Sequence, residues 1–223
     1  MLYFRGCTAR EKQTGISMAT EKLLNLAGVN YHILDDEKCC GSVLLRTGFE
    51  KEAREQMEKN TEILRDEKIV TSCAGCYKTF KEDYEGLDVI HISQLLDELI
   101  KEDKLNFSKK DFNVTYHDSC HLGRHCEVFD EPRSVIESIA GLVEMENNRE
   151  NSLCCGAGGG VKSAYPGVAD EMAKLRLSQA KKTGCDTLIT PCPFCKLNLE
   201  NDDLEVLDLT EFLVKYGDLD GEQ

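Results

Sequence analysis

Apolar residues along this chain follow two alternating patterns. Short segments rich in apolar and β-branched residues, of the kind that form parallel strands, recur at 2–4, 31–34, 68–71, 89–92, 113–116, 142–145, 187–190 and 206–209. Between them, apolar residues recur every three or four positions, which predicts helices at 14–27, 49–66, 73–84, 93–100, 131–140, 166–183 and from 210 onward. Strands that alternate with helices predict an α/β fold with mostly parallel strands.

Two details of these helices follow from the same pattern. The spacing in the helix at 49–66 points four residues inward, namely Phe49, Ala53, Met57 and Leu64. Ser93 and Thr210 each stand just before an apolar helical stretch, and serine and threonine are favoured N-cap residues. We therefore expect both to cap the helix that follows them.

Ten of the twelve cysteines form a five-membered pattern that occurs twice. Each copy has a lone cysteine, then an adjacent pair followed by glycine, then a Cys-x-x-Cys pair. The first set is Cys7, Cys39, Cys40, Cys73 and Cys76. The second set is Cys120, Cys154, Cys155, Cys192 and Cys195. Every group follows a predicted strand, and ligands in parallel sheets lie at the carboxyl ends of strands, so we expect the thiols at that edge of each sheet.

Equivalent features of the two copies are separated by a nearly constant distance. The offsets are 113 for the lone cysteines, 115 for the doublets, 119 for the Cys-x-x-Cys pairs and 117 for Ser93 and Thr210. A polar stretch at 101–111 reads as a linker. We predict two duplicated α/β halves, 1–105 and 112–223, with mostly parallel sheets related by a pseudo-twofold axis.

Composition limits the possible partners. The chain has 223 residues, and its 41% of hydrophobic residues is ordinary for a folded protein. Its net charge of −14 argues against nucleic acid as a partner. The N-terminal segment lacks the pattern of a signal peptide, and no apolar stretch is long enough to span a membrane. We therefore expect a cytoplasmic protein, in which many cysteines indicate metal or redox chemistry rather than disulfides. A partner could still bring it to a membrane.

The number of thiols in each set favours iron–sulfur chemistry. Five thiols are one more than tetrahedral zinc uses, and the side chains of adjacent cysteines diverge, whereas a multi-iron cluster offers several metal atoms close together. Zinc in one repeat is the alternative. The cysteine spacing of cubane ferredoxins is absent, so a partner would have to deliver the electrons.

Glycines next to the doublets are candidate cofactor-binding positions. Gly41, Gly156, Gly158 and Gly159 would let the backbone approach closely and turn its N–H groups toward sulfide or an anion; a flexible loop is the alternative. The run is no dinucleotide fingerprint, because Val161 stands where its third glycine should be.

Four segments resemble one known family, the cysteine-rich CCG domains. They are 4–8 (FRGCT), 117–124 (HDSCHLGR), 154–159 (CCGAGG) and 192–195 (CPFC). The family includes the catalytic subunits of heterodisulfide reductases, in which the domain forms a separate subunit or the C-terminal half of a longer one. It also includes iron–sulfur subunits of anaerobic glycerol-3-phosphate dehydrogenase, lactate-utilisation systems and some succinate:quinone reductases. Ser119 departs from the pattern, which has proline there.

The resemblance implies that each set of five cysteines binds a non-cubane [4Fe-4S] cluster. In the heterodisulfide reductase branch two such clusters face each other and cleave the coenzyme M–coenzyme B disulfide. A ferredoxin-like iron–sulfur subunit would be the partner, with a flavoprotein or membrane cytochrome beyond it. Two complete motifs favour this disulfide-reducing role. The other hypotheses are an electron-transfer subunit of a lactate, glycerol-3-phosphate or other organic-acid dehydrogenase, and a non-catalytic module that binds zinc.

Cleaving a disulfide to two thiols also takes protons. Three histidines flank the second motif and are candidate donors: His117, His121 and His125. Lys162 is a candidate contact for an anionic substrate. A solvated or supporting role is the ordinary alternative for each, so we assign no catalytic residue from the sequence. Cys126 and Cys185 lie outside both motifs, and we expect them to be inert thiols.

Overall fold

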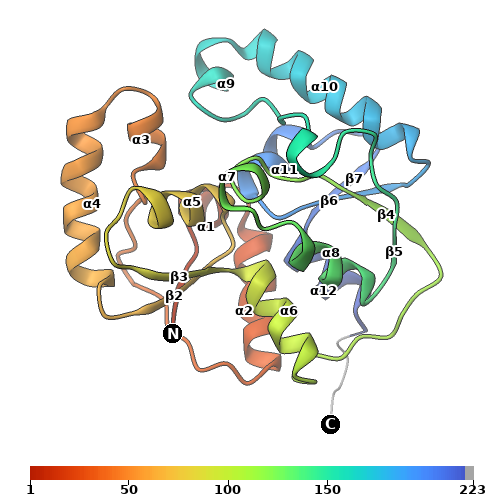
Figure 1. The fold of residues 1–223 in the computed structure, drawn as a ribbon, viewed down its shortest axis with the longest axis horizontal. Helices are drawn as coiled ribbons and strands as arrows, with labels where there is room; N and C mark the ends of the chain where they lie inside the picture. The colour runs from red at the N-terminus through yellow and green to blue at the C-terminus, as the bar shows by residue number, and fades with distance from the viewer. Residues whose placement is uncertain (219–223) are drawn as a thin grey trace.

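The computed structural model describes residues 1–218 and arranges them in two parallel β-sheets covered by helices (Figure 1). The first sheet has the order β1-β2-β3 and the second β5-β4-β6-β7. Their strands are β1 (Leu2–Phe4), β2 (Lys68–Thr71), β3 (Asp88–His91), β4 (Asn113–Tyr116), β5 (Gly141–Leu142), β6 (Thr187–Thr190) and β7 (Glu205–Asp208). Every pairing is parallel, so the predicted α/β class is confirmed.

The predicted strand at 31–34 is wrong as a strand. Only His32 pairs with the sheet, through a single parallel bridge to Leu2, because the chain turns away at Asp35 toward the first doublet. This bridge occupies the place beside β1 that β5 occupies beside β4. The two halves therefore share one strand order. In the first half, the strand equivalent to β5 is reduced to the single bridge at His32.

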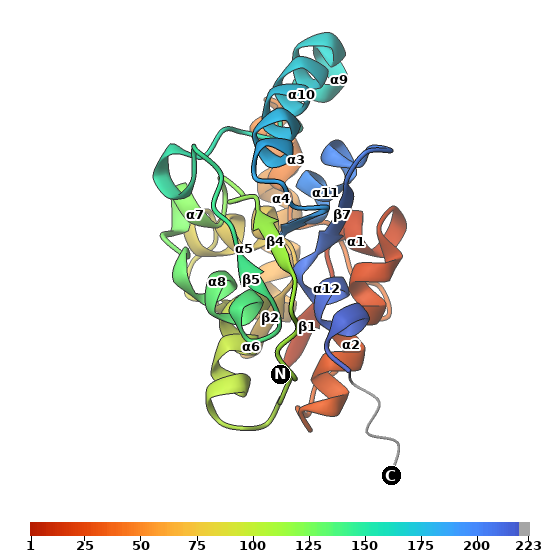
Figure 2. The same ribbon diagram turned by 90° about the vertical axis from the view of Figure 1, so that its right-hand side faces the viewer.

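Four helices, two from each half, pack between the sheets. They are α2 (Thr14–Leu26), α6 (Ile92–Lys101), α8 (Asp130–Glu137) and α12 (Leu209–Tyr216). Helix α2 packs on α12 and α6 packs on α8 (Figure 2). Leu23, Leu96, Val135 and Phe212 belong to the single buried cluster that results. Because the halves share this core, the division into 1–105 and 112–223 stays a prediction.

Two of these central helices, α6 and α12, begin two residues earlier than the caps in the sequence suggest. The prediction of Ser93 and Thr210 as N-caps is wrong, since the N-caps of α6 and α12 are His91 and Asp208. Their side chains accept hydrogen bonds from Ser93 N (3.2 Å) and Thr210 N (2.9 Å). A histidine ring and a carboxyl group therefore do what the two hydroxyls were expected to do.

The longest helices, α4 (Glu50–Leu64) and α10 (Pro166–Lys182), lie toward the outside of their halves (Figure 1). Ala53, Met57 and Leu64 are buried as predicted. The prediction for Phe49 is wrong: it precedes the helix as its N-cap and is 56% exposed. It lies instead in the lining of the cavity described below.

Short helices start close to the cysteine groups at the carboxyl ends of the strands. They are α1 (Cys7–Glu11), α3 (Ser42–Arg46), α5 (Ala74–Glu82), α7 (Gly123–Cys126), α9 (Val161–Ala164) and α11 (Pro193–Leu199). Only α5 among them was predicted, because helices of four to seven residues have too few turns to show a periodic pattern. Among residues 1–218, no helix has the length and apolar character needed to cross a bilayer.

Candidate metal centres

The Cys-x-x-Cys pairs are positioned by a strand that ends and a helix that begins. Cys73 is the N-cap of α5, and Cys192 is the N-cap of α11. Cys73 Sγ accepts a weak hydrogen bond from Cys76 N at 3.5 Å. The positive end of a helix dipole stabilises a thiolate, but neighbouring thiols and burial raise the pKa values of Cys73, Cys76 and Cys195. Of the two pairs, only Cys192 has a lowered pKa.

The two sets of cysteines have the same distribution of burial. In each set the lone cysteine and the first member of the doublet are partly exposed: Cys7, Cys39, Cys120 and Cys154. The other members are buried: Cys40, Cys73, Cys76, Cys155, Cys192 and Cys195. Matching burial at five positions shows that the duplication extends from the sequence to the environment of each thiol.

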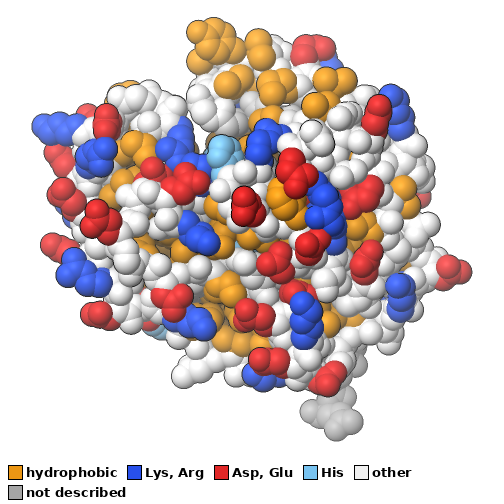
Figure 3. All heavy atoms as spheres, viewed as in Figure 1, with side chains coloured by type: hydrophobic (Ala, Val, Ile, Leu, Met, Phe, Trp, Pro, Cys, Tyr) orange, Lys and Arg blue, Asp and Glu red, His pale blue; other side chains and the backbone are white. Residues whose placement is uncertain are grey.

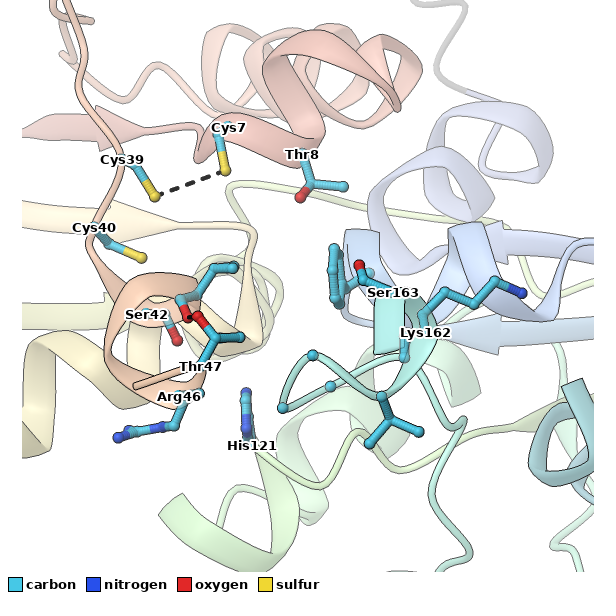
Figure 4. Close-up of a pocket in the computed structure, with 18 of the residues that line it drawn as sticks. Cys7, Thr8, Cys39, Cys40, Ser42, Arg46, Thr47, His121, Lys162 and Ser163 are labelled. Carbon is cyan, nitrogen blue, oxygen red and sulfur yellow. Dashed lines mark hydrogen bonds between the residues drawn. The ribbon is translucent and has the colours of Figure 1, made fainter. Parts of the chain in front are cut away.

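The ten thiols form one continuous row. The sulfurs of Cys7 and Cys39 are 3.9 Å apart (Figure 4). Along the rest of the row, each thiol shifts the pKa of its neighbour through a side-chain hydrogen bond. The order is Cys7, Cys39, Cys40, Cys76, Cys73, Cys192, Cys195, Cys155, Cys154 and Cys120. Cys73 and Cys192 join the two sets, so the candidate centres are neighbours.

Three cysteines in this row have lowered pKa values, each because two thiols stabilise its thiolate. Cys39 and then Cys76 lower the pKa of Cys40. Cys195 and Cys73 do so for Cys192, and Cys120 and Cys155 for Cys154. In the opposite direction, Cys39 raises the pKa of Cys7 and Cys154 raises that of Cys120. A bound metal would deprotonate the whole row, since thiolate is the form that ligates.

The donor set fits iron–sulfur clusters better than preformed zinc sites. All twelve cysteines are free thiols. Within residues 1–218, one group of three ligating side chains has all its donor atoms within 4.8 Å of one another, and it is His117, Cys155 and Cys195. No four thiols of this described part are as compact as a tetrahedral zinc site requires. Ten sulfurs spread along a row suit clusters, whose several irons each take one or two of them.

His117 is fully buried and lies near Cys155 and Cys195 of the second set. Its Nδ1 accepts a hydrogen bond from Arg176 Nε at 2.9 Å, while its Nε2 is buried without a partner. Burial, and next the positive charge of Arg176, lower the pKa of His117 to about 3. This ring is therefore neutral at physiological pH. Nothing in the periodicity of the sequence marks Arg176 as its partner.

The predicted glycines divide into two groups. Gly41 (φ 85°) and Gly156 (φ 90°) lie under the doublets, where a Cβ would come 3.5 Å from Ala53 O and 2.6 Å from Ala169 O, respectively. Gly158 and Gly159 line the cavity, and a Cβ on either would meet nothing within 4 Å. The first pair allows close packing of a helix; the second pair leaves open space beside the thiols.

Two further glycines lie against the thiols and were not singled out from the sequence. A Cβ on Gly6 (φ 81°) would come 3.1 Å from Cys76 Sγ. A Cβ on Gly75 would come 3.7 Å from Cys73 Sγ and 3.4 Å from His121 Nδ1. Both stand next to a cysteine of the motif, and that adjacency is the signal that could have identified them.

A cavity of about 790 Å³ opens between the halves beside the first set. All five thiols of the first set line it, whereas Cys192 is the one cysteine of the second set that does. The opposite wall is the glycine run with α9 (Figure 4). On the surface, the hollow lies between α3 and α9 (Figure 3). Its volume falls in the usual range for small-molecule sites, about 300–1,000 Å³.

The cavity lining is basic although the protein is acidic. Arg46, Lys162 and His121 contribute to it, and no aspartate or glutamate of the described residues does. Arg46 pairs with Asp83 at 2.8 Å and Lys162 with Asp170 at 2.5 Å. A lining with bases but no acids favours an anionic occupant.

The candidate proton donors and the lysine are brought together only in part. His121 lines the cavity beside Gly75. His125 stacks edge-on against His121, with ring centroids 5.6 Å apart, outside the lining. Burial lowers the pKa of both rings. In Figure 4 the amine of Lys162 extends away from the thiols of the first set.

The two remaining cysteines stand apart from the row. Cys185 is buried, and Cys126 is half-buried on α7. Burial raises the pKa of Cys126 to about 11. Neither contributes to the cavity, and their inertness stays a prediction.

Comparison with known proteins identifies the pattern. The CCG cysteine-rich domain model matches residues 1–81 and 114–200, which is more than half of the chain and contains all ten thiols. One subunit of the dihydromethanophenazine:CoB–CoM heterodisulfide reductase from Methanosarcina acetivorans is 43% identical over 216 residues, covering 89% of this chain and 53% of that protein.

Two further relatives carry other names. One subunit of the fumarate reductase (CoM/CoB) from Methanothermobacter marburgensis is 36% identical, covering 97% of this chain and 46% of that protein. EtfAB:quinone oxidoreductase from Syntrophomonas wolfei is 33% identical, covering 87% of this chain and 30% of that protein. The chain spans about half the length, or less, of these curated relatives.

Proposed function

The chain belongs to the CCG family of cysteine-rich domains, and from this premise we propose that it is the disulfide-reducing iron–sulfur subunit of a heterodisulfide-reductase-type complex. One observation carries the proposal. Two complete sets of five free thiols occupy equivalent places and join in a single row. A subunit that only passes electrons to a partner does not need two complete and adjacent sets.

In this proposal each set holds one cluster. The first would be bound by Cys7, Cys39, Cys40, Cys73 and Cys76. The second would be bound by Cys120, Cys154, Cys155, Cys192 and Cys195. The clusters would be non-cubane [4Fe-4S] clusters, which supply electrons one at a time and iron sites that bind sulfur. The contact between Cys73 and Cys192 supports two centres close enough to act on one substrate.

The protein's own residues would bind and orient the disulfide. The cavity lies beside the first set and reaches the second at Cys192, so a small disulfide there would lie next to both. Arg46 lines the cavity and would attract an anionic substrate, such as the coenzyme M–coenzyme B heterodisulfide. Reduction takes two electrons and two protons and yields two thiols. Of the candidate histidines, His121 lines the cavity, and in this proposal it would pass the protons.

Partners would have to supply the electrons. We propose a ferredoxin-like iron–sulfur subunit as the immediate donor, with a flavoprotein or membrane cytochrome beyond it, at a cytoplasmic location. The named complexes among the relatives support a role as one component of a larger assembly.

The test is anaerobic purification followed by metal and activity measurements on one sample. We expect about eight irons per chain, the number in two [4Fe-4S] clusters, with matching sulfide and no zinc. A reduced dye should be oxidised on adding the coenzyme M–coenzyme B heterodisulfide. The Cys155→Ser variant should lose iron and activity together, whereas the Cys126→Ser variant should retain both. Full iron content without any disulfide turnover would refute the proposal.

The similarity to EtfAB:quinone oxidoreductase favours a second candidate function. The same centres could pass electrons from an organic-acid dehydrogenase toward a quinone. Copurification with a flavin dehydrogenase, full iron content and no disulfide turnover would establish this alternative. Zinc without sulfide would instead indicate a non-catalytic module.

A further inference from the structure

The two sets of thiols have unlike neighbours, and His117 is the clearest difference. Its counterpart in the first half is Phe4: each is the third residue before the lone cysteine of its set, at the end of β1 or just after β4. Phe4 packs edge-on against Phe80, with ring centroids 4.8 Å apart. A phenyl ring has no N–H to donate, so the first set lacks the donor that the second set has.

Arg176 is the second difference. The carbonyls of Ala53 and Ala169 face Gly41 and Gly156 in the same way, and seven residues later stand Asn60 and Arg176. Asn60 is neutral, and its amide donates to Cys39 O (2.9 Å) and to the Tyr84 hydroxyl (3.0 Å). In the second half the same place on the helix holds a cation that bonds to His117.

The hydrogen bond between Arg176 and His117 decides which ring nitrogen carries the proton. A guanidinium group only donates, so Nδ1 of His117 must present a lone pair to Arg176 Nε. A neutral imidazole with a bare Nδ1 carries its hydrogen on Nε2. This Nε2–H cannot ligate a metal and is free to donate. Nε2 is the ring nitrogen without a partner, and the ring has a nitrogen within 4.8 Å of the sulfurs of Cys155 and Cys195.

The charge of Arg176 also needs a counterpart. Arg176 is fully buried, and the carboxylate that most favours its charge, Asp118, already pairs with Arg133. The other buried basic side chains of residues 1–218, Lys78, Arg133 and Lys196, all make ion pairs. An uncompensated buried charge is strongly destabilising. The thiolates of the second set would supply the missing negative charge.

Resting on the proposed function, we propose that His117 donates its Nε2–H to sulfur of the second centre, and that Arg176 positions it to do so, which gives the second centre a higher reduction potential than the first. Hydrogen bonds to sulfur and nearby positive charge stabilise the more negative, reduced state of a cluster. The first electron to enter therefore resides on the centre bound by 120–195, and the cavity-lining centre is reduced second.

The experiment is a redox titration followed by electron paramagnetic resonance, on the full chain with its clusters and partner subunits, purified without oxygen. In the His117→Phe variant, which installs the residue of the first half, one midpoint potential should fall by about 59 mV, a tenfold change in a one-electron equilibrium. The other midpoint should not move. Arg176→Met should lower the same midpoint.

Two further variants separate hydrogen bonding from packing. His117→Gln keeps an N–H donor and should restore most of the lost potential. His125→Phe changes a histidine of the same motif that lies away from the thiols, and it should leave both midpoints unchanged. Iron, sulfide and zinc are counted on every sample.

Each remaining outcome overturns the inference. If His117→Phe retains full iron and neither midpoint moves, His117 does not tune the second centre. If the variant loses half of its iron, His117 is a ligand or an assembly residue instead. If the unaltered protein contains zinc and no sulfide, the proposed function itself fails, and metal analysis distinguishes that failure from the first two.

Discussion

Of the alanine substitutions at the glycines that follow the two doublets, Gly156→Ala should destabilise the protein most. Gly156 has φ 90°, and a Cβ there would lie 2.6 Å from Ala169 O and 3.0 Å from Met172 Cβ. The oxygen belongs to the backbone of α10, so it can move only if the helix moves. The doublet or α10 must therefore shift to accept the alanine.

The structure gives a magnitude for this change and for two matched controls. Left-handed backbone at a non-glycine residue costs about 1–2 kcal/mol, and overpacking typically costs about 1–3 kcal/mol, so Gly156→Ala should cost about 2–5 kcal/mol. Gly41→Ala (φ 85°) meets the flexible Met57 Cε at 3.3 Å and should cost mainly the backbone term. Gly158→Ala meets nothing within 4 Å and should be nearly neutral.

The assay is the thermal midpoint of anaerobically purified protein, with iron counted on the same samples. At about 2–4 °C per kcal/mol for a chain of this length, Gly156→Ala should lower the midpoint by about 4–20 °C and reduce iron content. The order of damage should be Gly156, then Gly41, then Gly158. A Gly158→Ala variant as unstable as Gly156→Ala would refute the reasoning, because its loss could not come from a clash with α10.

Three other substitutions test separate parts of the structure. Cys126→Ser should leave the iron count unchanged, and Cys155→Ser should lower it, as measured by metal analysis; equal loss from both would contradict the five-thiol sets. Asp118→Asn removes a buried carboxylate that binds Arg133 Nη1 and Nη2 at 2.8 and 2.9 Å. The free energy of unfolding should fall by about 3 kcal/mol, at the low end for a broken buried pair, because Glu144 still pairs with Arg133; chemical denaturation measures it. Burial raises the pKa of Asp208 from 3.8 to about 8, so between these pH values the folded state retains a proton that the unfolded state has lost. Its contribution to stability is fully present below about pH 4 and is lost as the pH rises to about 8. Asp208→Asn should flatten the fall in thermal midpoint between about pH 4 and 8, and an unchanged slope would exclude Asp208 as its source.

Much of the fold could be predicted because strands and long helices carry their own periodic signal. Residues 68–71 (KIVT) and 187–190 (TLIT) are short segments rich in β-branched residues, and both are strands. The errors lie where the outcome depends on distant residues. Phe49 fits the apolar spacing of α4, but the helix starts one residue later and leaves it at the cavity. His91 replaces Ser93 as an N-cap because β3 and α6 meet directly, with no loop between them.

The candidate site was predictable in its thiols and not in the residues around them. Spacing alone identified the ten cysteines, since their pattern repeats within the chain. Arg176 carries no such mark: it lies in a helix rich in charged residues, and its role depends on His117, 59 residues away. The adjacency of Cys73 and Cys192 was equally hidden, because it depends on how the two halves pack together.

An internal duplication offers a comparison that a single copy cannot. Positions at which the two halves agree, such as the five thiols and the glycine after each doublet, meet a requirement common to both centres. Positions at which they differ cannot be explained by that requirement. Phe4 and His117 stand at equivalent places, as do Asn60 and Arg176, and both differences make the second centre more electropositive. Two differences of the same sign beside one centre favour a functional difference in reduction potential between the centres. Neutral drift would not be expected to place a hydrogen-bond donor and its supporting cation together. A two-electron reaction carried out one electron at a time is a process in which such an inequality has a use, since it sets which centre is filled first.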